Sequence, residues 1–165
     1  MFSINDVVMY GSNGICRITS IEKRNLTGKA VEYLILCPVY NDKNTYYVPA
    51  DNDELLKKLQ RICTREEVDD LIRHIKDEKA EWIENENVRK EEYGRIIKSG
   101  NRHEIIKLLN TLYLRRKQLA ANKKRLRTFD ESLFDIAENM IFEEFAYVLG
   151  IDLEDVGKYI QEHIA

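Results

Sequence analysis

The 165-residue chain carries a cluster of basic side chains close together in the sequence: Arg115, Arg116, Lys117, Lys123, Lys124, Arg125 and Arg127. Cations grouped in this way bind the backbone phosphates of nucleic acid, and each neutralised phosphate releases condensed counterions. The cluster contrasts with the formal net charge of the whole chain, which is -3. In a second interpretation, these cations complement a helix dipole and pair with neighbouring acidic helices. The composition leaves both interpretations open.

The only tryptophan, Trp82, lies in the polar stretch DEKAEWIENENVRKEEYGR. If this stretch is helical, Trp82 shares a face with Glu86, Arg89 and Tyr93. A large aromatic ring among charges can stack on bases or wedge between base pairs. It can equally cover a junction between helices, and the sequence alone does not separate the two roles.

Sequence patterns of catalysis and metal binding are absent. The chain contains no glycine-rich phosphate loop, no G-x-S-x-G motif and no H-E-x-x-H motif. His74, His103 and His163 fall on separate expected helices without ligands at metal spacing, so we expect exposed helical histidines. The pair Glu143-Glu144 projects in two directions about 100° apart on a helix and is expected to be solvated. We expect no enzyme, no catalytic residue, no metal and no cofactor.

The three cysteines, Cys16, Cys37 and Cys63, are odd in number and widely spaced. This pattern favours buried, reduced thiols over disulfides or a metal site. The first residues, MFSINDVVMY, contain no basic segment, and no run of 18 uncharged apolar residues occurs anywhere. We therefore expect a cytoplasmic protein with no membrane contact.

Short β-strands are predicted in the first part of the chain, at residues 4–10, 14–22, 30–37 and 44–48, with a last one near 59–62. Turn residues such as Gly11 to Gly14 separate them and favour antiparallel pairing. The stretch AVEYLILCPVY is almost continuously apolar, which predicts a strand covered on both faces. Four or five such strands in about 60 residues predict a small barrel of the Tudor or SH3 type.

Helices are predicted from about residue 64 onward. Capping boxes at Thr64 to Glu67 and Thr128 to Glu131 mark two helix starts, and Asn101 marks a third. The expected helices cover residues 64–75, 78–98, 101 onward, 128–150 and 152 onward. They are too short to be stable alone, so their apolar faces predict a helical bundle. The expected fold class is α+β, with a β domain over residues 1–62 and an all-α domain over residues 63–165.

Motifs along essentially the whole chain resemble those of one family. The stretch VVMYGSNGICRITSIEKRNLTGKAVEYLIL, followed by YYVPAD, looks like the N-terminal domain of the CarD/CdnL bacterial transcription regulators. That domain has a V-V-Y start, a hairpin glycine, an I-E strand, E-Y-hydrophobic and then V-P. The stretches RKEEYGRIIKSGN, IIKLLNTLYLRRKQL, KKRL and AENMIFEEFAYVLG follow in the family's order.

The resemblance implies a non-enzymatic regulator with two partners. The Tudor-like domain of the family, which also occurs in the transcription-repair coupling factor, docks on the β subunit of RNA polymerase. The helical domain contacts promoter DNA weakly and largely without sequence specificity at the upstream edge of the transcription bubble, where a tryptophan wedges into the minor groove. Such a protein modulates open-complex stability and is associated with the nucleoid. We expect a monomer, while an exposed strand edge permits a domain-swapped dimer.

The resemblance also implies roles for individual residues of the β domain. Arg24 matches the basic polymerase-contacting position after the I-E strand. Tyr47 stands just before Val48-Pro49, where other members of the family carry a second arginine. A tyrosine at this position can still anchor a protein interface.

On the DNA side, Arg89 and the pair Lys124-Arg125 match basic positions of the family. Arg116, Lys117 and Lys123 extend this set within the basic cluster. Counted back from Ser99-Gly100, the family's wedge position falls on Glu86, one expected helical turn after Trp82. The wedge role is nevertheless assigned to Trp82, because the two positions share an expected helix face.

A second hypothesis belongs to another class. The acidic overall balance of the chain is compatible with a protein–protein adaptor that uses the β domain on another partner and never touches DNA. The two hypotheses differ in the role of the basic cluster, which the adaptor does not need.

Overall fold

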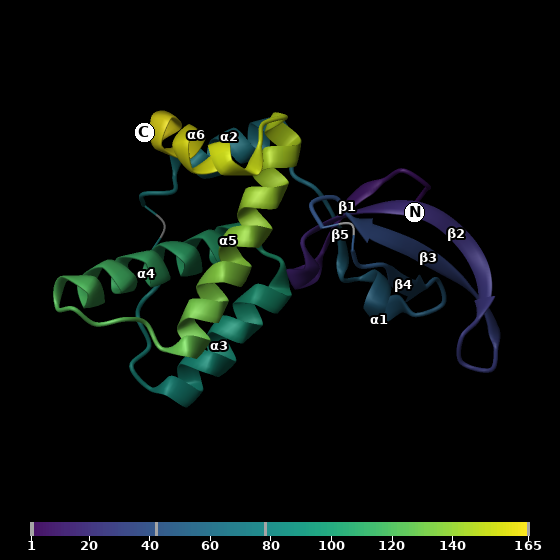
Figure 1. Cartoon of the computed structure of the whole chain (residues 1–165), viewed down its shortest axis with the longest axis horizontal. Helices are drawn as coiled ribbons and strands as arrows, with labels where there is room; N and C mark the ends of the chain where they lie inside the picture. The colour runs from purple at the N-terminus through teal and green to yellow at the C-terminus, as the bar shows by residue number, and fades with distance from the viewer. Residues whose placement is uncertain (1, 42, 78, 165) are drawn as a thin grey trace. The chain divides into compact units, whose positions relative to one another are not determined.

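The structure, a computed structural model, describes residues 2–41, 43–77 and 79–164. The chain divides into two compact units, Met1–Ile62 and Cys63–Ala165. The first contains an antiparallel sheet and the second contains helices (Figure 1). The predicted α+β fold class, with a small β domain followed by a helical part, is confirmed.

The five strands of the first unit are β1 Val7–Tyr10, β2 Ile15–Asn25, β3 Ala30–Pro38, β4 Tyr46–Pro49 and β5 Leu59–Arg61. They pair in the order β4-β3-β2-β1-β5, with every neighbouring pair antiparallel. Each lies within a few residues of a predicted strand. The sheet is open, because β4 and β5 form its two edges and have no ladder between them in the described part of the chain. A short helix that the sequence analysis did not predict, α1 Asp53–Leu56, begins where the Asn52 side chain accepts the amide of Leu55.

The β1–β2 hairpin forms at the predicted glycines. A single turn of 3-10 helix, Gly11–Asn13, joins the strands, and Gly14 follows it with a φ of 80°. Residues with a Cβ rarely adopt this left-handed backbone, so glycine suits the position. The amide of Tyr10 donates to the Gly14 carbonyl at 2.9 Å and closes the turn.

The core of the sheet is built from alternate residues of its strands, which point to one face. Its buried members are Val8, Cys16, Ile18, Leu34, Leu36, Val48 and Leu59. On β3, however, the four consecutive residues from Tyr33 to Leu36 are all buried. This run confirms the predicted strand that is covered on both faces.

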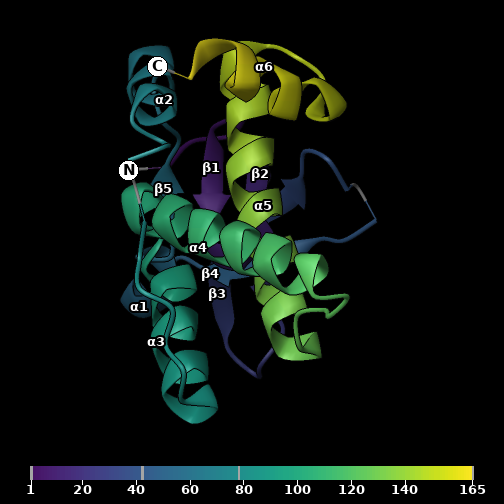
Figure 2. The ribbon, with the colours of Figure 1, turned by 90° about the vertical axis from the view of Figure 1, so that its left-hand side faces the viewer.

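The helices of the second unit are α2 Arg65–Arg73, α3 Glu86–Ser99, α4 Arg102–Ala121, α5 Thr128–Leu149 and α6 Val156–His163. A turn of 3-10 helix, Leu153–Asp155, precedes α6. The long helix α5 contacts each of the other four, and Figure 2 shows α4 crossing it. Because α5 touches every other helix, it organises the unit. None of the described helices is long and apolar enough to span a membrane.

The helix ends follow the predicted caps at α2 and α4. Thr64 and Glu67 form the complete capping box of α2, and the Asn101 side chain accepts the amide of Glu104 at the start of α4. Gly100 and Gly150 end α3 and α5 in the left-handed conformation, as helix ends favour.

The capping box predicted at Thr128 is wrong. The amide of Glu131 donates to the carbonyl of Arg127 at 2.9 Å, so the helix begins one residue earlier than the motif suggested. Arg127 is therefore the cap, although its side chain makes no hydrogen bond to the first turn, and Thr128 already lies within that turn.

The predicted helix from Glu78 is also wrong in its first part. Helix α3 begins only at Glu86, because the Asn85 side chain accepts the amide of Val88 and caps it. Trp82 therefore lies on a non-helical segment, and Glu78 itself lies outside the described residues. The argument that Trp82 and Glu86 share a helix face fails with it.

Glu144 on α5 is completely buried, so the expectation of a solvated glutamate pair is wrong for this residue. Arg102 donates to both carboxylate oxygens, from Nε at 2.9 Å and from Nη2 at 2.8 Å. The backbone amide of Cys63 donates to Oε2 at 3.0 Å. Helix α4 thus supplies the counter-charge that permits a glutamate in the core.

We expect Glu144→Gln to destabilise the protein by about 3 kcal/mol, because it leaves the mostly buried Arg102 without its anion. The shift in the urea midpoint, followed by the helical circular dichroism signal, measures this change. Glu92→Gln is the matched control: it breaks an exposed pair with Arg95 on α3 and should shift the urea midpoint far less. Equal losses in the two variants would contradict a structural role for the buried pair.

The cysteines are all free thiols. Cys16 is fully buried as expected, whereas Cys37 and Cys63 are half-buried. Burial, together with the nearby charge of Glu144, raises the pKa of Cys63 to about 12.

With that pKa, only about one Cys63 thiol in 10⁴ is ionised at pH 8. We therefore expect iodoacetamide to modify Cys63 far more slowly in the folded protein than in urea, as mass spectrometry of its peptide can measure. Equal rates in the folded and unfolded protein would contradict the raised pKa.

Candidate functional site

Arg24 and Tyr47 come together on the sheet although they are far apart in the sequence. Arg24 lies on β2 and Tyr47 on β4, the two strands that flank β3. The guanidinium carbon of Arg24 lies 5.7 Å from the centre of the Tyr47 ring, and Tyr47 is 43% exposed. We call these two residues the Arg24–Tyr47 pair.

Glu22 holds the Arg24 side chain in place. Arg24 donates to the same Glu22 oxygen from Nε at 3.0 Å and from Nη2 at 2.7 Å. These hydrogen bonds raise the pKa of Arg24 and lower the pKa of Glu22. The result is an exposed cation and an exposed aromatic ring side by side, an arrangement found at the centres of protein interfaces.

Trp82 lies on the non-helical segment of residues 79–85, which we call the Trp82 segment. Its ring packs edge-on against Tyr93 of α3, with 6.3 Å between the ring centres. The guanidinium carbons of Arg89 and Arg115 lie over the ring, 4.5 and 5.0 Å from its centre. Trp82 is only half-buried, so part of the ring remains accessible.

Arg89 is buried, with only 4% of its surface exposed. Its Nε and Nη2 donate to the two carboxylate oxygens of Asp130, each at 2.9 Å. Hydrogen bonding to Asp130 raises the pKa of Arg89. The structure therefore places Arg89 beneath Trp82 and turned toward α5, and not on the surface with the other basic residues.

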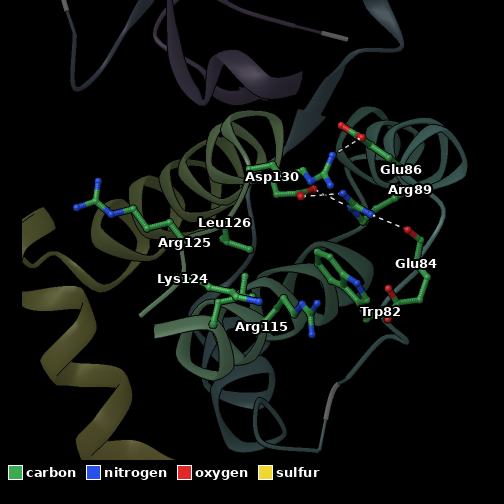
Figure 3. Close-up of a pocket in the computed structure, with 11 residues that line it drawn as sticks. Trp82, Glu84, Glu86, Arg89, Arg115, Lys124, Arg125, Leu126 and Asp130 are labelled. Atoms are coloured by element: carbon green, nitrogen blue, oxygen red, sulfur yellow. Dashed lines mark hydrogen bonds and ion pairs between the residues drawn. The ribbon is translucent and has the colours of Figure 1, made fainter. Parts of the chain in front are cut away.

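A cleft of ≈ 310 Å³ opens beside Trp82. Its lining residues include Trp82, Arg115, Leu119, Lys124, Arg125 and Leu126, and we call it the Trp82 cleft. Figure 3 shows Arg89 between Trp82 and Asp130 on one side, and Arg115 and Lys124 on the other. The segment that joins α4 to α5 forms part of its wall.

Three cations of that connecting segment are exposed and unneutralised within the described structure. The side chains of Lys123, Lys124 and Arg125 form no hydrogen bond or ion pair with another described residue. Lys123 adopts a left-handed backbone with a φ of 58°, which turns the chain sharply after α4. These three positions present positive charge to solvent.

The other predicted basic residues are less available. Arg116 pairs with Glu131 at 3.7 Å and lies over the Phe134 ring, while Lys117 lies over the ring of Tyr113. Arg116 and Lys117 are therefore already in contact with α4 and α5 side chains.

The carboxylates beside the Trp82 cleft are mostly neutralised. Arg127 and Lys90 pair with Glu86, at 2.8 and 3.4 Å, and Arg89 pairs with Asp130. Glu84 also lines the cleft. The balance leaves Arg115, Lys124 and Arg125 as a positive group that favours an anion.

Arg115 was missed as a site residue by the sequence analysis, which counted it only within the basic cluster. Its Nε is buried and makes no hydrogen bond among the described atoms. The helical periodicity contained the signal: Arg115 continues the buried stripe of Leu108 and Leu112 at a spacing of three and so had to face inward. Asp130 was missed because its arginine partner lies on another helix.

The side chains gathered at the Trp82 cleft are suited to binding an anion. No group of three or more His, Cys, Asp and Glu side chains within residues 2–41, 43–77 and 79–164 could hold a metal ion. The three histidines are exposed as expected, His74 at the end of α2, His103 on α4 and His163 on α6. An exposed group of cations around a half-buried indole ring is suited to a phosphate-bearing polymer.

Comparison with known protein families gives two matches. The model described as CarD-like/TRCF RID domain matches residues 2–63, and the model described as CarD, C-terminal domain, matches residues 70–161. The two matches are consecutive and together span almost the whole chain. None of the curated proteins matches it.

Proposed function

The chain belongs to the CarD family of non-enzymatic, transcription-associated proteins that interact with RNA polymerase, and from this we propose a function with two contacts. The β unit docks on the polymerase β subunit through the Arg24–Tyr47 pair. The helical unit contacts promoter DNA at the upstream edge of the bubble through Trp82 and the connecting segment. Together they prolong the life of the open complex.

One observation carries the DNA part of this proposal. Lys123, Lys124 and Arg125 are exposed without an intramolecular partner in the described structure, and they adjoin a cleft that contains Trp82. Cations that served to neutralise neighbouring acidic helices would be paired with carboxylates, as Arg127 is with Glu86. The unpaired state favours a polyanion as their partner.

Duplex DNA alone should bind weakly, because the chain has a net charge of -3 and the segment between α4 and α5 contributes three exposed, unpaired cations. Polymerase bound to the β unit raises the local concentration of the helical unit at the promoter. The affinity for isolated DNA is therefore expected to fall steeply with salt, while the ternary complex persists.

The net negative charge also favours a second candidate, an adaptor that uses the Arg24–Tyr47 pair on a protein and makes no DNA contact. In the adaptor, the unpaired cations have no role. The two candidates are separated by variants that address each surface alone.

Arg24→Ala should weaken polymerase binding about tenfold and leave DNA affinity unchanged, because the two surfaces lie in different units. The double variant Lys124→Gln, Arg125→Gln should do the reverse and lower the slope of log affinity against log salt by about 2. Fluorescence anisotropy of labelled duplex and co-sedimentation with polymerase measure the two affinities. The controls are Lys29→Ala, in the β2–β3 turn, and Lys158→Gln, an exposed lysine on α6.

If the double variant retains full DNA affinity, or if Arg24→Ala lowers both affinities together, the proposal of two separate surfaces fails. Regulation that persists after neutralisation of Lys124 and Arg125 supports the adaptor.

Trp82→Ala should shorten the open-complex lifetime toward the value without the protein, because the ring no longer stabilises the distorted duplex. Polymerase binding should remain, since Trp82 lies outside the β unit. The measurement is the decay of heparin-resistant complexes on a ribosomal-type promoter with the host polymerase. The control is Tyr113→Ala, which removes an exposed aromatic ring of α4 outside the Trp82 cleft and should leave the lifetime unchanged.

A wild-type protein that neither binds polymerase nor changes this lifetime would refute the proposed function. A Trp82→Ala variant with the wild-type lifetime would refute the wedge role alone.

A further inference from the structure

We propose that Arg89 is a positioning residue, which fixes the Trp82 ring from below and does not itself bind a DNA phosphate. The part of the inference that concerns DNA affinity rests on the proposed function, whereas the part that concerns the position of the Trp82 ring does not. It reassigns a residue for which the family resemblance implied a direct DNA contact.

The Trp82 segment has no helical hydrogen bonds of its own, and side chains of α3 and α4 replace them. The hydroxyl of Thr111 accepts the amide of Ala80 at 3.0 Å and lies 2.9 Å from its carbonyl. The hydroxyl of Tyr93 donates to the Glu81 carbonyl at 3.1 Å and accepts the amide of Ile83 at 3.4 Å. Thr111 and Tyr93 are both buried, so these anchors are shielded from competing water.

Arg89 supplies the anchors on the other side of Trp82. Its Nη1 donates to the carbonyl of Ile83 at 3.0 Å and to that of Glu84 at 3.3 Å. With the two bonds to Asp130, four hydrogen bonds use most of the five N–H donors of the guanidinium. A buried guanidinium with its donors occupied has little left to offer a phosphate.

The same guanidinium also fixes the plane on which the indole rests. The bidentate pair with Asp130 fixes the orientation of the planar guanidinium, and its carbon lies 4.5 Å from the centre of the Trp82 ring. Asp130 is in the first turn of α5, so α5 determines the location of the ring through Arg89. Figure 3 shows this sequence from Asp130 through Arg89 to Trp82.

A lysine cannot replace Arg89 in this role. An ammonium group is a compact charge without a planar fork, so it would lose the bidentate geometry and the flat support. If Arg89 instead bound a phosphate directly, Arg89→Lys should be tolerated, since lysine retains the positive charge that binds the phosphate. The pair of variants Arg89→Lys and Arg89→Met therefore separates positioning from direct binding.

The experiment uses Trp82 as its own reporter, since it is the only tryptophan in the chain. In the absence of DNA, acrylamide quenching and fluorescence anisotropy measure how exposed and how mobile the ring is. We expect both Arg89 variants to raise quenching and lower anisotropy. Lys90→Met, a change at the neighbouring exposed position, should leave both unchanged.

DNA affinity across a salt series is the second readout. A mobile ring must be ordered on binding, so both Arg89 variants should bind about threefold to tenfold more weakly. The slope of log affinity against log salt should stay at the wild-type value, because no phosphate contact is lost. Retained affinity in Arg89→Lys, with a slope lowered by about 1 in Arg89→Met, would overturn the proposal and make Arg89 a phosphate ligand.

Loss of the buried Arg89 can unfold the helical unit, which circular dichroism detects. Two milder variants, Tyr93→Phe and Thr111→Val, then take the place of the Arg89 variants. Each keeps the Arg89–Asp130 ion pair and removes one hydroxyl group that anchors the Trp82 segment. They should raise quenching of Trp82 without loss of the fold. Unchanged Trp82 fluorescence in all folded variants would overturn the proposal, even if the protein binds DNA normally. If the wild-type protein does not bind DNA at any salt concentration, the proposed function fails, while the fluorescence results still decide the role of Arg89.

Discussion

The helical unit depends on two carboxylates that α5 keeps out of water. Asp130 and Glu144 are both buried, and each binds an arginine of another helix in a two-pronged ion pair. The residues are 14 positions apart, which is nearly four whole turns and about 21 Å along the helix. Arg89 thereby fixes α3 near one end of α5, and Arg102 fixes the start of α4 near the other. Buried pairs of this kind add little net stability, and we infer that here they favour one arrangement of the helices, because a packing that separates the partners leaves a buried charge unpaired.

Most of the elements could be predicted from local sequence, because their causes are local. The glycines at 11 and 14 produce a hairpin, Thr64 with Glu67 caps α2, and Gly100 and Gly150 end helices. At Thr128 the boundary was wrong by one residue, because the backbone of Arg127 already accepts the first helical hydrogen bond. The larger error, in the stretch before Glu86, occurs where side chains from other parts of the unit compete with the local signal. Thr111, Tyr93 and Arg89 supply hydrogen bonds to the backbone around Trp82, and no pattern within that stretch records them.

The candidate site shows the same division. Composition was enough to find the basic cluster and the single tryptophan, and the family motifs indicated Arg24 and Tyr47. The charge of a residue could not distinguish the buried Arg89 and the half-buried Arg115 from the exposed Lys124, since each side chain carries one positive charge wherever it lies. The distinction depends on Asp130 and on the Trp82 ring, which are brought near only by tertiary packing.

The open edges of the sheet have a consequence for behaviour at high concentration. Unpaired strand edges can template pairing between molecules and so begin aggregation. Here the edge strand β4 has four residues and ends in Pro49, which has no amide to donate, and β5 has three residues. Strands this short cannot support a long intermolecular ladder. The small sheet therefore remains open without presenting a long template for fibre growth.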